Sequence, residues 1–220
     1  MPPVEPVTRH RLPPSPRSTS AASVSGVPTT IVLVRHGETN WNRERRYQGH
    51  ADTPLNEDGR SQAAELAELL AAEPVTALYT SPLRRARETA EIIAAKLGLQ
   101  LRTLEALREI DVGAWEGLTI DEVRGRYPER FDRDWHSGWE DGETYHELEQ
   151  RVVPALVALG SRHDGAHLVG VTHAGPIRAA IAASMGLSYD DARPQIGPLA
   201  NCALFRFVVR DGILEPAGFT

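Results

Sequence analysis

The chain has 220 residues, of which 41% are hydrophobic and 25% are charged, as is ordinary for a soluble globular protein. Its formal net charge of −6 argues against broad nucleic-acid binding, so any site for an anion must be a local cluster of basic residues. The single cysteine, Cys202, excludes an intrachain disulfide, and no apolar run approaches the roughly 18 residues that span a bilayer, so we expect a cytoplasmic protein without membrane contact.

Residues 1–28 contain seven of the 16 prolines, many serines and no hydrophobic period. This composition cannot bury enough apolar surface to offset the entropy of ordering the chain, so we predict a disordered Pro/Ser-rich tail. The segment also lacks the apolar stretch of a secretory signal. Residues 29–220 carry a net charge of −8 and are long enough for one domain with a sizeable core.

The first motif begins at residues 30–34, a continuous apolar and β-branched run that predicts a strand buried on both faces. Arg35, His36 and Gly37 follow this strand directly. Because α/β sheets bind ligands at the carboxyl ends of their strands, the basic pair marks a candidate site. The alternative is a strand that ends in a polar turn, with His36 in solvent.

Residues 42–58 are polar and aromatic, and we interpret them as a loop over the mouth of the site. Asn56 is a typical N-cap for an alanine-rich helix, which we predict over about 57–72. The apolar face of this helix has the i, i+3, i+4, i+7 spacing and consists of Ala63, Leu66, Ala67 and Leu70.

A short strand is predicted at 77–80, and Ser81-Pro82 then predicts a helix start, with serine as the cap and proline at the first helical position. Gly98 is expected to end this helix. Three arginines lie in its first turn and a half, where the helix dipole favours anions over cations. We expect Arg84 and Arg87 to be solvated, and Arg85 to hold an anion together with the helix terminus.

The middle of the chain predicts a strand at 99–103, an irregular segment at 107–117 and two helices that begin at capping boxes. Between these helices, residues 126–143 are interpreted as a surface excursion. The capping boxes pair Thr119 with Glu122 and Thr144 with Glu147, and the tryptophans expected to pack against the domain are Trp135 and Trp139.

A second motif repeats the first. Residues 167–172 predict another buried strand, His173 follows it, and Pro176 is expected to open a helix that runs to Met185. Residues 202–209 predict the last strand. Strands that alternate with helices in this way predict an α/β fold with a largely parallel sheet.

The strand-to-helix junctions of a parallel sheet open on one edge, which brings their basic residues together. The planar fork of arginine binds phosphate oxygens through two parallel hydrogen bonds, so two arginines and two histidines can surround one tetrahedral anion. The residues concerned are Arg35, His36, Arg85 and His173.

Five segments form a pattern that is more specific than any single motif. They are Arg35-His36-Gly37-Glu38-Thr39 with Asn42, Ser81-Pro82-Leu83-Arg84-Arg85-Ala86, Leu107-Arg108-Glu109 with Gly113, Gly142-Glu143-Thr144, and Thr172-His173-Ala174-Gly175. Together they resemble the histidine phosphatase superfamily, in the branch of the cofactor-dependent phosphoglycerate mutases and their phosphatase relatives, over about residues 30–205. The resemblance implies that residues 29–220 form a catalytic domain of the phosphoglycerate mutase-like type. Such a domain is a three-layer α/β sandwich with a mostly parallel central sheet flanked by helices.

The resemblance also implies a role for each matching residue. His36 is the nucleophile that becomes phosphohistidine, and Glu109 is the general acid. The residues that hold the phosphoryl oxygens are Arg35, Arg85 and His173, and those expected to line the substrate pocket are Asn42, Gln48, Gly49 and Ala174.

This chemistry needs positioning and positive charge, so we expect no metal and no other cofactor. A histidine nucleophile must be neutral, and neighbouring arginines favour that form. His163 and His167 have zinc-like spacing, but the Asp-Gly between them breaks the helix that would align them. Trp115 is left open between a core and a ligand-contact role, His50 can line the pocket, and Arg151 is expected to pair with a carboxylate.

Two activities share these residues. Family mutases carry a long insertion between the positions that match Glu109 and His173, whereas only 63 residues separate them here, as in the phosphatase relatives. We therefore predict a phosphomonoesterase for a small soluble phosphate ester. The alternatives are a cofactor-dependent phosphoglycerate mutase and a catalytically silent phosphate-binding module. The sequence identifies neither the substrate nor the oligomeric state, and it is compatible with both a monomer and a homodimer.

Overall fold

The computed structural model of the chain describes residues 26–129, 139 and 141–219. The predicted disordered tail, residues 1–28, therefore lies outside the described residues except for its last three, and Trp135 lies outside them as well. Those last three residues reach the domain, because the Gly165 amide donates a hydrogen bond of 2.9 Å to the Val27 carbonyl.

One sheet of six strands lies at the centre of the molecule, in the order β3-β2-β4-β1-β5-β6. The first four strands in this order pair in parallel, and the last two join antiparallel, which confirms the predicted mostly parallel sheet. The strands are β1 (Thr29–Arg35), β2 (Ala77–Thr80), β3 (Leu101–Thr103), β4 (His167–Thr172), β5 (Leu204–Arg210) and β6 (Ile213–Phe219).

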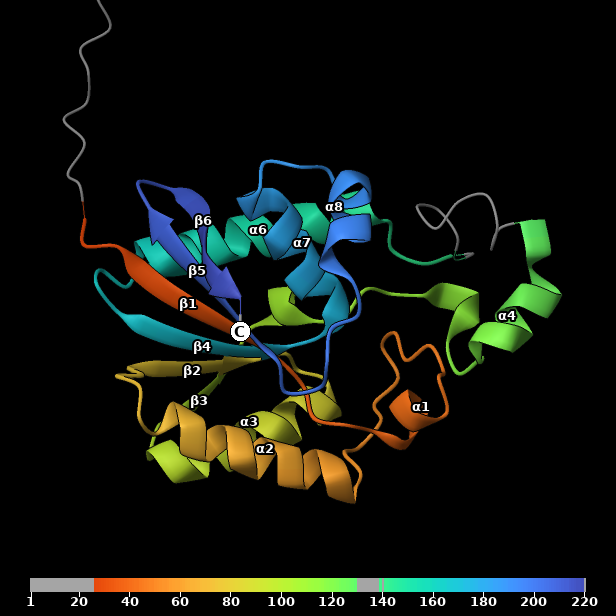
Figure 1. Ribbon diagram of the computed structural model, residues 1–220, viewed down its shortest axis with the longest axis horizontal. Helices are drawn as coiled ribbons and strands as arrows, with labels where there is room; N and C mark the ends of the chain where they lie inside the picture. Colours follow the sequence, from red (N-terminus) through yellow and green to blue (C-terminus); the bar gives the residue numbers. More distant parts are fainter. Residues whose placement is uncertain (1–25, 130–138, 140, 220) are drawn as a thin grey trace, which may run out of the picture.

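Helices cover both faces of the sheet, so the domain has the three layers that the sequence predicts (Figure 1). Helices α2 and α3 pack together on one face, and α6, α7 and α8 lie on the other. The helices with described bounds are α1 (Asn40–Arg43), α2 (Glu57–Leu70), α3 (Arg84–Leu97), α4 (Ile120–Arg126), α6 (Tyr145–Ser161), α7 (Ala174–Ser184) and α8 (Tyr189–Ile196).

Strand β1 divides the hydrophobic core into two halves. Ile31 and Leu33 belong to the cluster that includes side chains of α6 and α7, whereas Val32 and Val34 belong to the cluster beneath α2 and α3. All four side chains are at most 1% exposed. A strand covered on both faces has no polar side to alternate with, which explains why its sequence is a continuous apolar run.

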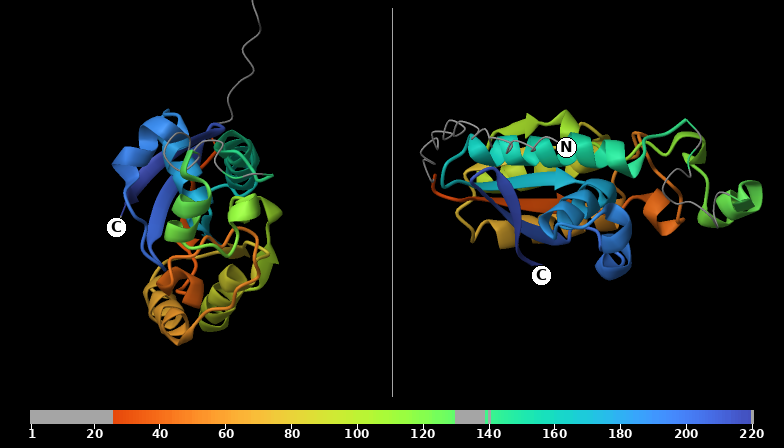
Figure 2. Two further views of the ribbon diagram at one scale, coloured as in Figure 1. Left: turned by 90° about the vertical axis from the view of Figure 1, so that its right-hand side faces the viewer. Right: turned by 90° about the horizontal axis from the view of Figure 1, so that it is seen from above.

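The carboxyl ends of β1, β2 and β4 lie next to one another. Arg35 is in register with Thr172, and Thr80 is in register with Val171, so the residues that follow these strands emerge at one edge of the sheet. Helices α1 and α4 lie beyond the same edge (Figure 2). The topology therefore brings together the three junctions that carry the candidate residues.

Several predicted element boundaries are wrong. The N-cap of α3 is Leu83, which makes no side-chain capping bond, and not Ser81. Helix α7 begins at Ala174, directly after His173, and not at Pro176. Helices α1 and α8 and strand β6 were not predicted. The β6 strand forms an edge hairpin with β5 through Asp211 and Gly212, both with positive φ.

The predicted helix caps are otherwise confirmed. The Asn56 side chain accepts from the Gly59 amide at 2.8 Å, and the Thr119 and Thr144 capping boxes both form. Gly98 ends α3 in the left-handed conformation. Among the residues that the structure describes, no helix has both the length and the apolar character needed to cross a membrane.

Candidate active site

A cavity of about 210 Å³ opens at the carboxyl edge of the sheet. Its lining comes from the three junctions and from the loops and helices around them. Four of the five residues with predicted chemical roles line it, namely Arg35, His36, Arg85 and Glu109, and so do the four predicted pocket residues, Asn42, Gln48, Gly49 and Ala174.

His36 lies at the centre of this edge and is only 2% exposed. Its Nδ1 lies 2.7 Å from the Gly37 carbonyl oxygen, which can only accept, so Nδ1 carries the proton and donates it. The lone pair of a neutral ring is then on Nε2. Burial, followed by the charges of Arg85 and Arg35, holds the pKa of His36 well below 6.5. The ring is therefore neutral near pH 7, as a nucleophile must be.

Arg85 is completely buried, unlike Arg84 and Arg87 on the same helix, which are exposed. Its two terminal nitrogens donate to the carbonyls of Ala51 and Gly49 at 2.7 and 2.9 Å. Burial lowers the pKa of Arg85 to about 10, so the guanidinium stays charged at neutral pH. Arg84 and Arg87 instead form exposed ion pairs with acidic residues one helical turn further on, which agrees with the predicted solvated role.

Arg35 is the second cation of the site, and its Nη1 donates to the Leu199 carbonyl. Burial lowers the pKa of Arg35 as well, and the nearby Glu109 carboxylate opposes that shift. The Nε atoms of Arg35 and Arg85 are both buried and have no hydrogen-bond partner among the described residues. Two guanidinium groups with unused buried donors can bind an anion strongly.

His173 is fully buried, and its ring centroid lies 5.2 Å from that of His36. Burial, followed by the charge of Arg85, holds the pKa of His173 well below 6.5. His173 is also the N-cap residue of α7, so the first amides of that helix lie beside the two histidines. The terminus of an α-helix with free amides attracts phosphate groups. The edge therefore combines two guanidinium groups with a helix terminus.

The Glu109 carboxylate is held by backbone amides. Its Oε1 accepts hydrogen bonds of 3.0 Å from the amides of Ile110 and Gly175. A Cβ at Gly175 would lie 2.4 Å from that oxygen, so glycine is the residue that permits this approach. The carboxyl group of Glu109 is thus fixed beside the start of α7.

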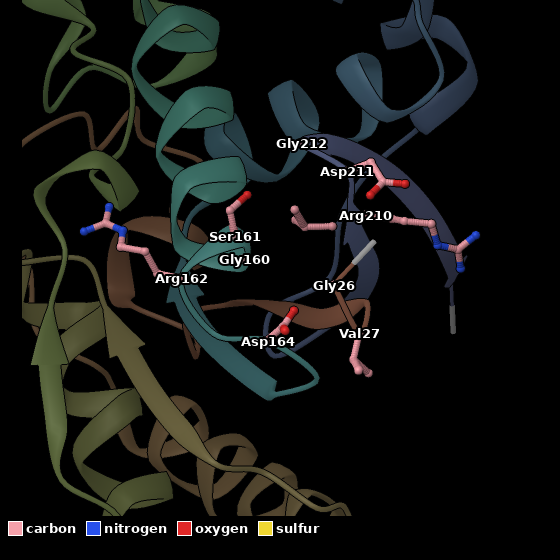
Figure 3. A pocket seen from close by; sticks show the side chains of 10 residues that line it. Gly26, Val27, Gly160, Ser161, Arg162, Asp164, Arg210, Asp211 and Gly212 are labelled. Carbon is pink, nitrogen blue, oxygen red and sulfur yellow. The ribbon is translucent and has the colours of Figure 1, made fainter. Parts of the chain in front are cut away.

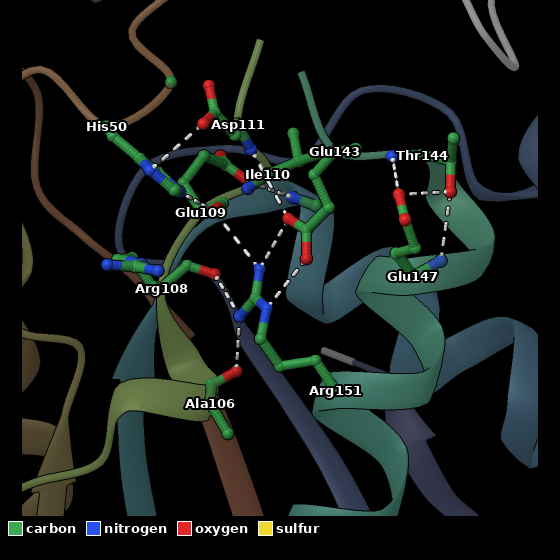
Figure 4. Close-up of polar contacts among 12 residues, drawn as sticks. His50, Ala106, Arg108, Glu109, Ile110, Asp111, Glu143, Thr144, Glu147 and Arg151 are labelled. Carbon is green, nitrogen blue, oxygen red and sulfur yellow. Dashed lines mark hydrogen bonds and ion pairs between the residues drawn. The ribbon is translucent and has the colours of Figure 1, made fainter. Parts of the chain in front are cut away.

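Arg151 of α6 fastens the segment that carries Glu109 (Figure 4). Its guanidinium pairs with both carboxylate oxygens of Glu143 at 2.7–2.8 Å, as the predicted pairing with a carboxylate requires. It also donates to the carbonyls of Ala106, Arg108 and Glu109 at 2.8–3.3 Å. Figure 4 also shows that His50 approaches the same segment, and its Nε2 lies 2.8 Å from the Glu109 carbonyl oxygen.

The pocket residues Asn42, Gln48 and Gly49 come from the segment that follows β1. Asn42 and Thr39 close the capping box of α1, and Gln48 Oε1 accepts from the Thr39 hydroxyl at 3.1 Å. Gly49 has φ +47°, a conformation that favours glycine, and this turn presents its carbonyl to Arg85. The segment predicted as a loop over the mouth of the site therefore lines part of the cavity.

Sequence reasoning did not predict an aromatic wall on the opposite side of the cavity. Trp139 lies against Tyr145 with ring centroids 5.7 Å apart, and Tyr145 stacks on Tyr189 at 3.7 Å. All three line the cavity, together with Arg178 of α7. Trp139 was predicted to pack against the domain, and it is 7% exposed. In the sequence, the feature that marks the two tyrosines is their position directly after the helix caps Thr144 and Ser188.

Other candidates lie away from the cavity. Trp115 is a fully buried core residue, which settles the question that the sequence left open. His163 Nε2 lies 2.9 Å from the Tyr79 hydroxyl, whereas His167 pairs with Glu73. Within the described part of the chain, no group of three or more His, Cys, Asp or Glu side chains is arranged to hold a metal ion.

A larger cavity of about 420 Å³ lies at the opposite end of the sheet, beside Gly26, Gly160 and Gly212 (Figure 3). Its charged side chains do not converge, and Figure 3 shows Arg162 and Arg210 pointing away from each other. Among the described residues, the buried histidines, His36 and His173, and the buried Arg85 all lie at the carboxyl edge, so the smaller cavity is the candidate active site.

Comparisons with known proteins agree with this geometry. The sequence profile of the "Histidine phosphatase superfamily (branch 1)" matches residues 31–215. The chain is 40% identical over 195 residues to "Phosphoglycerate mutase-like protein 4" of Arabidopsis thaliana, which covers 83% of this chain and 80% of that relative. It is 37% identical over 162 residues to "Phosphoserine phosphatase 1" of Hydrogenobacter thermophilus, which covers 71% of this chain and 76% of the relative.

Among solved structures, that of "Bacillus stearothermophilus YhfR" matches with a TM-score of 0.79 and 36% sequence identity. The match covers 86% of this chain and 95% of the other. Both the sequence profile and this fold therefore extend over the whole candidate site.

Proposed function

The chain belongs to branch 1 of the histidine phosphatase superfamily, and on this premise we propose that it is a phosphomonoesterase that forms a phosphohistidine at His36. The observation that carries the proposal is the hydrogen bond from His36 Nδ1 to the Gly37 carbonyl. It leaves Nε2 as the lone-pair nitrogen of a buried neutral ring, beside the buried Arg85 and the half-buried Arg35. A nucleophile with this protonation needs no further base to activate it.

In the first step, the lone pair of His36 Nε2 forms a bond to phosphorus as the ester P–O bond breaks. Glu109, in its protonated form, gives its proton to the departing oxygen. Such proton transfer contributes roughly 10²–10⁴-fold to a reaction. The step yields the free alcohol, a phosphohistidine and a Glu109 carboxylate.

In the second step, the Glu109 carboxylate takes a proton from a water molecule whose oxygen attacks phosphorus. The P–N bond breaks, its electron pair returns to His36 Nε2, and inorganic phosphate is released. Glu109 is protonated again, and the neutral histidine is restored, so the cycle balances.

The remaining residues stabilise the charge that is spread over the phosphoryl oxygens. Arg35 and Arg85 supply two guanidinium groups, and the amide of Ala174, the first residue of α7, supplies an uncharged donor. His173 supplies a further donor from the same junction. Preorganised donors of this kind stabilise a transition state because they need no reorientation during the reaction.

The small cavity supports a small phosphate ester as the substrate, and the relative called phosphoserine phosphatase 1 is consistent with such a metabolite. We place the enzyme in the cytoplasm, where its lone Cys202 fits a reducing setting. The competing activity is transfer of the phosphoryl group to a second hydroxyl, and the relative called phosphoglycerate mutase-like protein 4 is consistent with it.

The test uses the full chain with p-nitrophenyl phosphate and then with a panel of metabolite phosphates, with and without a chelator. We expect release of inorganic phosphate that the chelator does not change. Transfer of labelled phosphoryl groups between phosphoglycerates, without net phosphate release, would indicate the mutase instead. Binding of phosphate esters with no turnover of any of them would indicate a silent module.

A further inference from the structure

Ser81 was expected to cap α3, but the structure gives its hydroxyl a different task. The helix begins at Arg84, and its N-cap, Leu83, makes no side-chain capping bond. Ser81 is completely buried, and its Oγ lies 2.7 Å from Nε2 of His173, which is 92 residues away in the sequence. The Leu83 amide donates to the same Oγ at 3.3 Å.

The backbone holds Ser81 in place for this contact. Its amide donates to the Val171 carbonyl of β4 at 2.9 Å, which continues the pairing of β2 with β4 beyond the end of β2. The Thr80 hydroxyl donates to the Ser81 carbonyl at 3.0 Å. The serine hydroxyl is therefore presented to His173 by the sheet and not by a flexible loop.

The protonation of His173 follows from counting donors and acceptors. The ring is neutral, so one nitrogen carries a proton and the other carries a lone pair. Nδ1 is buried and has no partner among the described residues. Since Ser81 Oγ already accepts from the Leu83 amide, its own proton is free to be donated, and Nε2 is the acceptor that lies within reach.

The opposite tautomer is costlier. If Nε2 donated to Ser81, the serine proton would lack the acceptor that Nε2 provides, and a lone pair on Nδ1 would be buried without a donor. Each unsatisfied buried polar group costs roughly 1–3 kcal/mol. The arrangement with the proton on Nδ1 satisfies the serine and leaves a single unused N–H.

We propose that Ser81 is a positioning residue that fixes His173 as the tautomer with its proton on Nδ1. His173 then offers a hydrogen-bond donor to a phosphoryl oxygen and is not available as a base at Nε2. This role rests on the proposed phosphatase function. The two buried histidines carry the proton on the same atom but for opposite uses, since His36 acts through its lone pair and His173 through its N–H.

The test compares three variants of the full chain. Ser81→Ala removes the hydroxyl, and Ser81→Thr keeps it. Thr29→Val is a matched control, because it removes a buried hydroxyl at the start of β1 that donates to the His163 carbonyl, far from His173. We expect Ser81→Ala to lower kcat for p-nitrophenyl phosphate about 10- to 100-fold, less than the roughly 10²–10³-fold lost with a direct donor. Ser81→Thr should recover most of this loss, and Thr29→Val should stay within about threefold of the wild type.

A second readout does not depend on activity. In ¹⁵N-histidine spectra, with the His173 signals assigned by comparison with His173→Gln, the wild type should show a protonated Nδ1 and an unprotonated Nε2. Ser81→Ala should shift this ring towards a mixture of tautomers. A wild-type His173 with its proton on Nε2 would overturn the proposal, and so would equal loss of kcat in Ser81→Ala and Thr29→Val.

The two readouts separate this proposal from the function on which it rests. An active wild-type phosphatase with the proton of His173 on Nε2 leaves the function standing and rejects the role of Ser81. A protonated Nδ1 in a chain that turns over no phosphate ester supports the tautomer assignment and rejects the phosphatase. If Ser81→Ala does not fold, the wild-type spectrum and the Ser81→Thr activity still decide the question.

Discussion

The two strand–histidine junctions look alike in sequence, but the structure builds them differently. After β1, the chain continues from His36 into a loop, and the histidine bonds to the carbonyl of its own neighbour, Gly37. After β4, the chain enters α7 directly, and His173 bonds to Ser81, which follows the end of β2. The first junction fixes its histidine through local backbone, and the second fixes it through a side chain 92 residues away.

The difference assigns a separate task to each histidine. His36 is followed by a loop, so no helix begins directly after it. His173 instead lies at the start of α7, and the N-terminus of a helix favours an anion. We therefore propose that one junction provides the attacking atom and that the other provides donors to the group being attacked. The strongest test of this difference is to determine which of the two histidines carries the phosphoryl group.

The largest expected effect is therefore the loss of the covalent intermediate in His36→Ala. Acid quench of a single turnover with labelled substrate should trap an acid-labile, base-stable label on the wild-type chain. His36→Ala should carry none, because no other Nε2 replaces the nucleophile. His173→Ala should form the same label more slowly. Recovery of the label on a peptide that contains His173 would reverse the two roles.

Arg85 belongs to the third junction, and its charge lowers the pKa of both His36 and His173. Its removal should therefore have the next largest effect. Arg85→Ala should lower kcat/KM by at least roughly 10²–10³-fold, the loss typical of one preorganised donor. Arg84→Ala is the matched control, because an exposed ion pair contributes only about 0–1 kcal/mol. Thermal melts of both variants check that they fold. A larger loss in Arg84→Ala than in Arg85→Ala would contradict the observed placement of the α3 arginines.

Much of this arrangement could be predicted from the sequence, because local patterns encode it. The buried runs before His36 and His173 predicted two strands of a largely parallel sheet, and the structure places these strands next to each other. The family resemblance, now confirmed, distinguished Arg85 from Arg84. The task of Ser81 could not be predicted, because its partner is distant in the chain and the Ser-Pro pair also fits a helix start. The aromatic wall was missed for a similar reason, since Tyr145 and Tyr189 meet only when two separate helices pack.

Glu109 connects the chemistry at His36 to the second junction, since the Gly175 amide of α7 holds its carboxyl group. Glu109→Gln keeps an acceptor for that amide but cannot donate an acidic proton. We expect phosphorylation of the enzyme by alkyl phosphates to slow by roughly 10²–10⁴-fold, because a poor leaving group needs protonation. Phosphorylation by p-nitrophenyl phosphate should slow much less. Equal slowing of both burst phases would show that Glu109 is not the acid.

The smallest expected effect is on the free energy of unfolding. It tests a property that the two junctions share, which is a buried histidine whose ring is neutral in the folded chain. Burial holds the pKa values of His36 and His173 well below 6.5, so neither ring binds a proton in the folded chain near pH 6. The unfolded chain does bind protons there, so unfolding takes up protons and stability must fall as the pH drops below about 6.5.

Each histidine should contribute a slope of up to about 1.4 kcal/mol per pH unit between pH values of about 6.5 and 5. Urea unfolding at several pH values measures this slope, and the His173→Gln variant isolates one contribution because glutamine does not titrate. The variant should lose up to half of the combined slope of the two residues. The two chains differ at this residue alone, so the contributions of the residues that they share cancel in the difference. An unchanged slope in His173→Gln would mean that this ring is protonated in the folded state, which would remove the neutral tautomer on which the comparison of the two junctions depends.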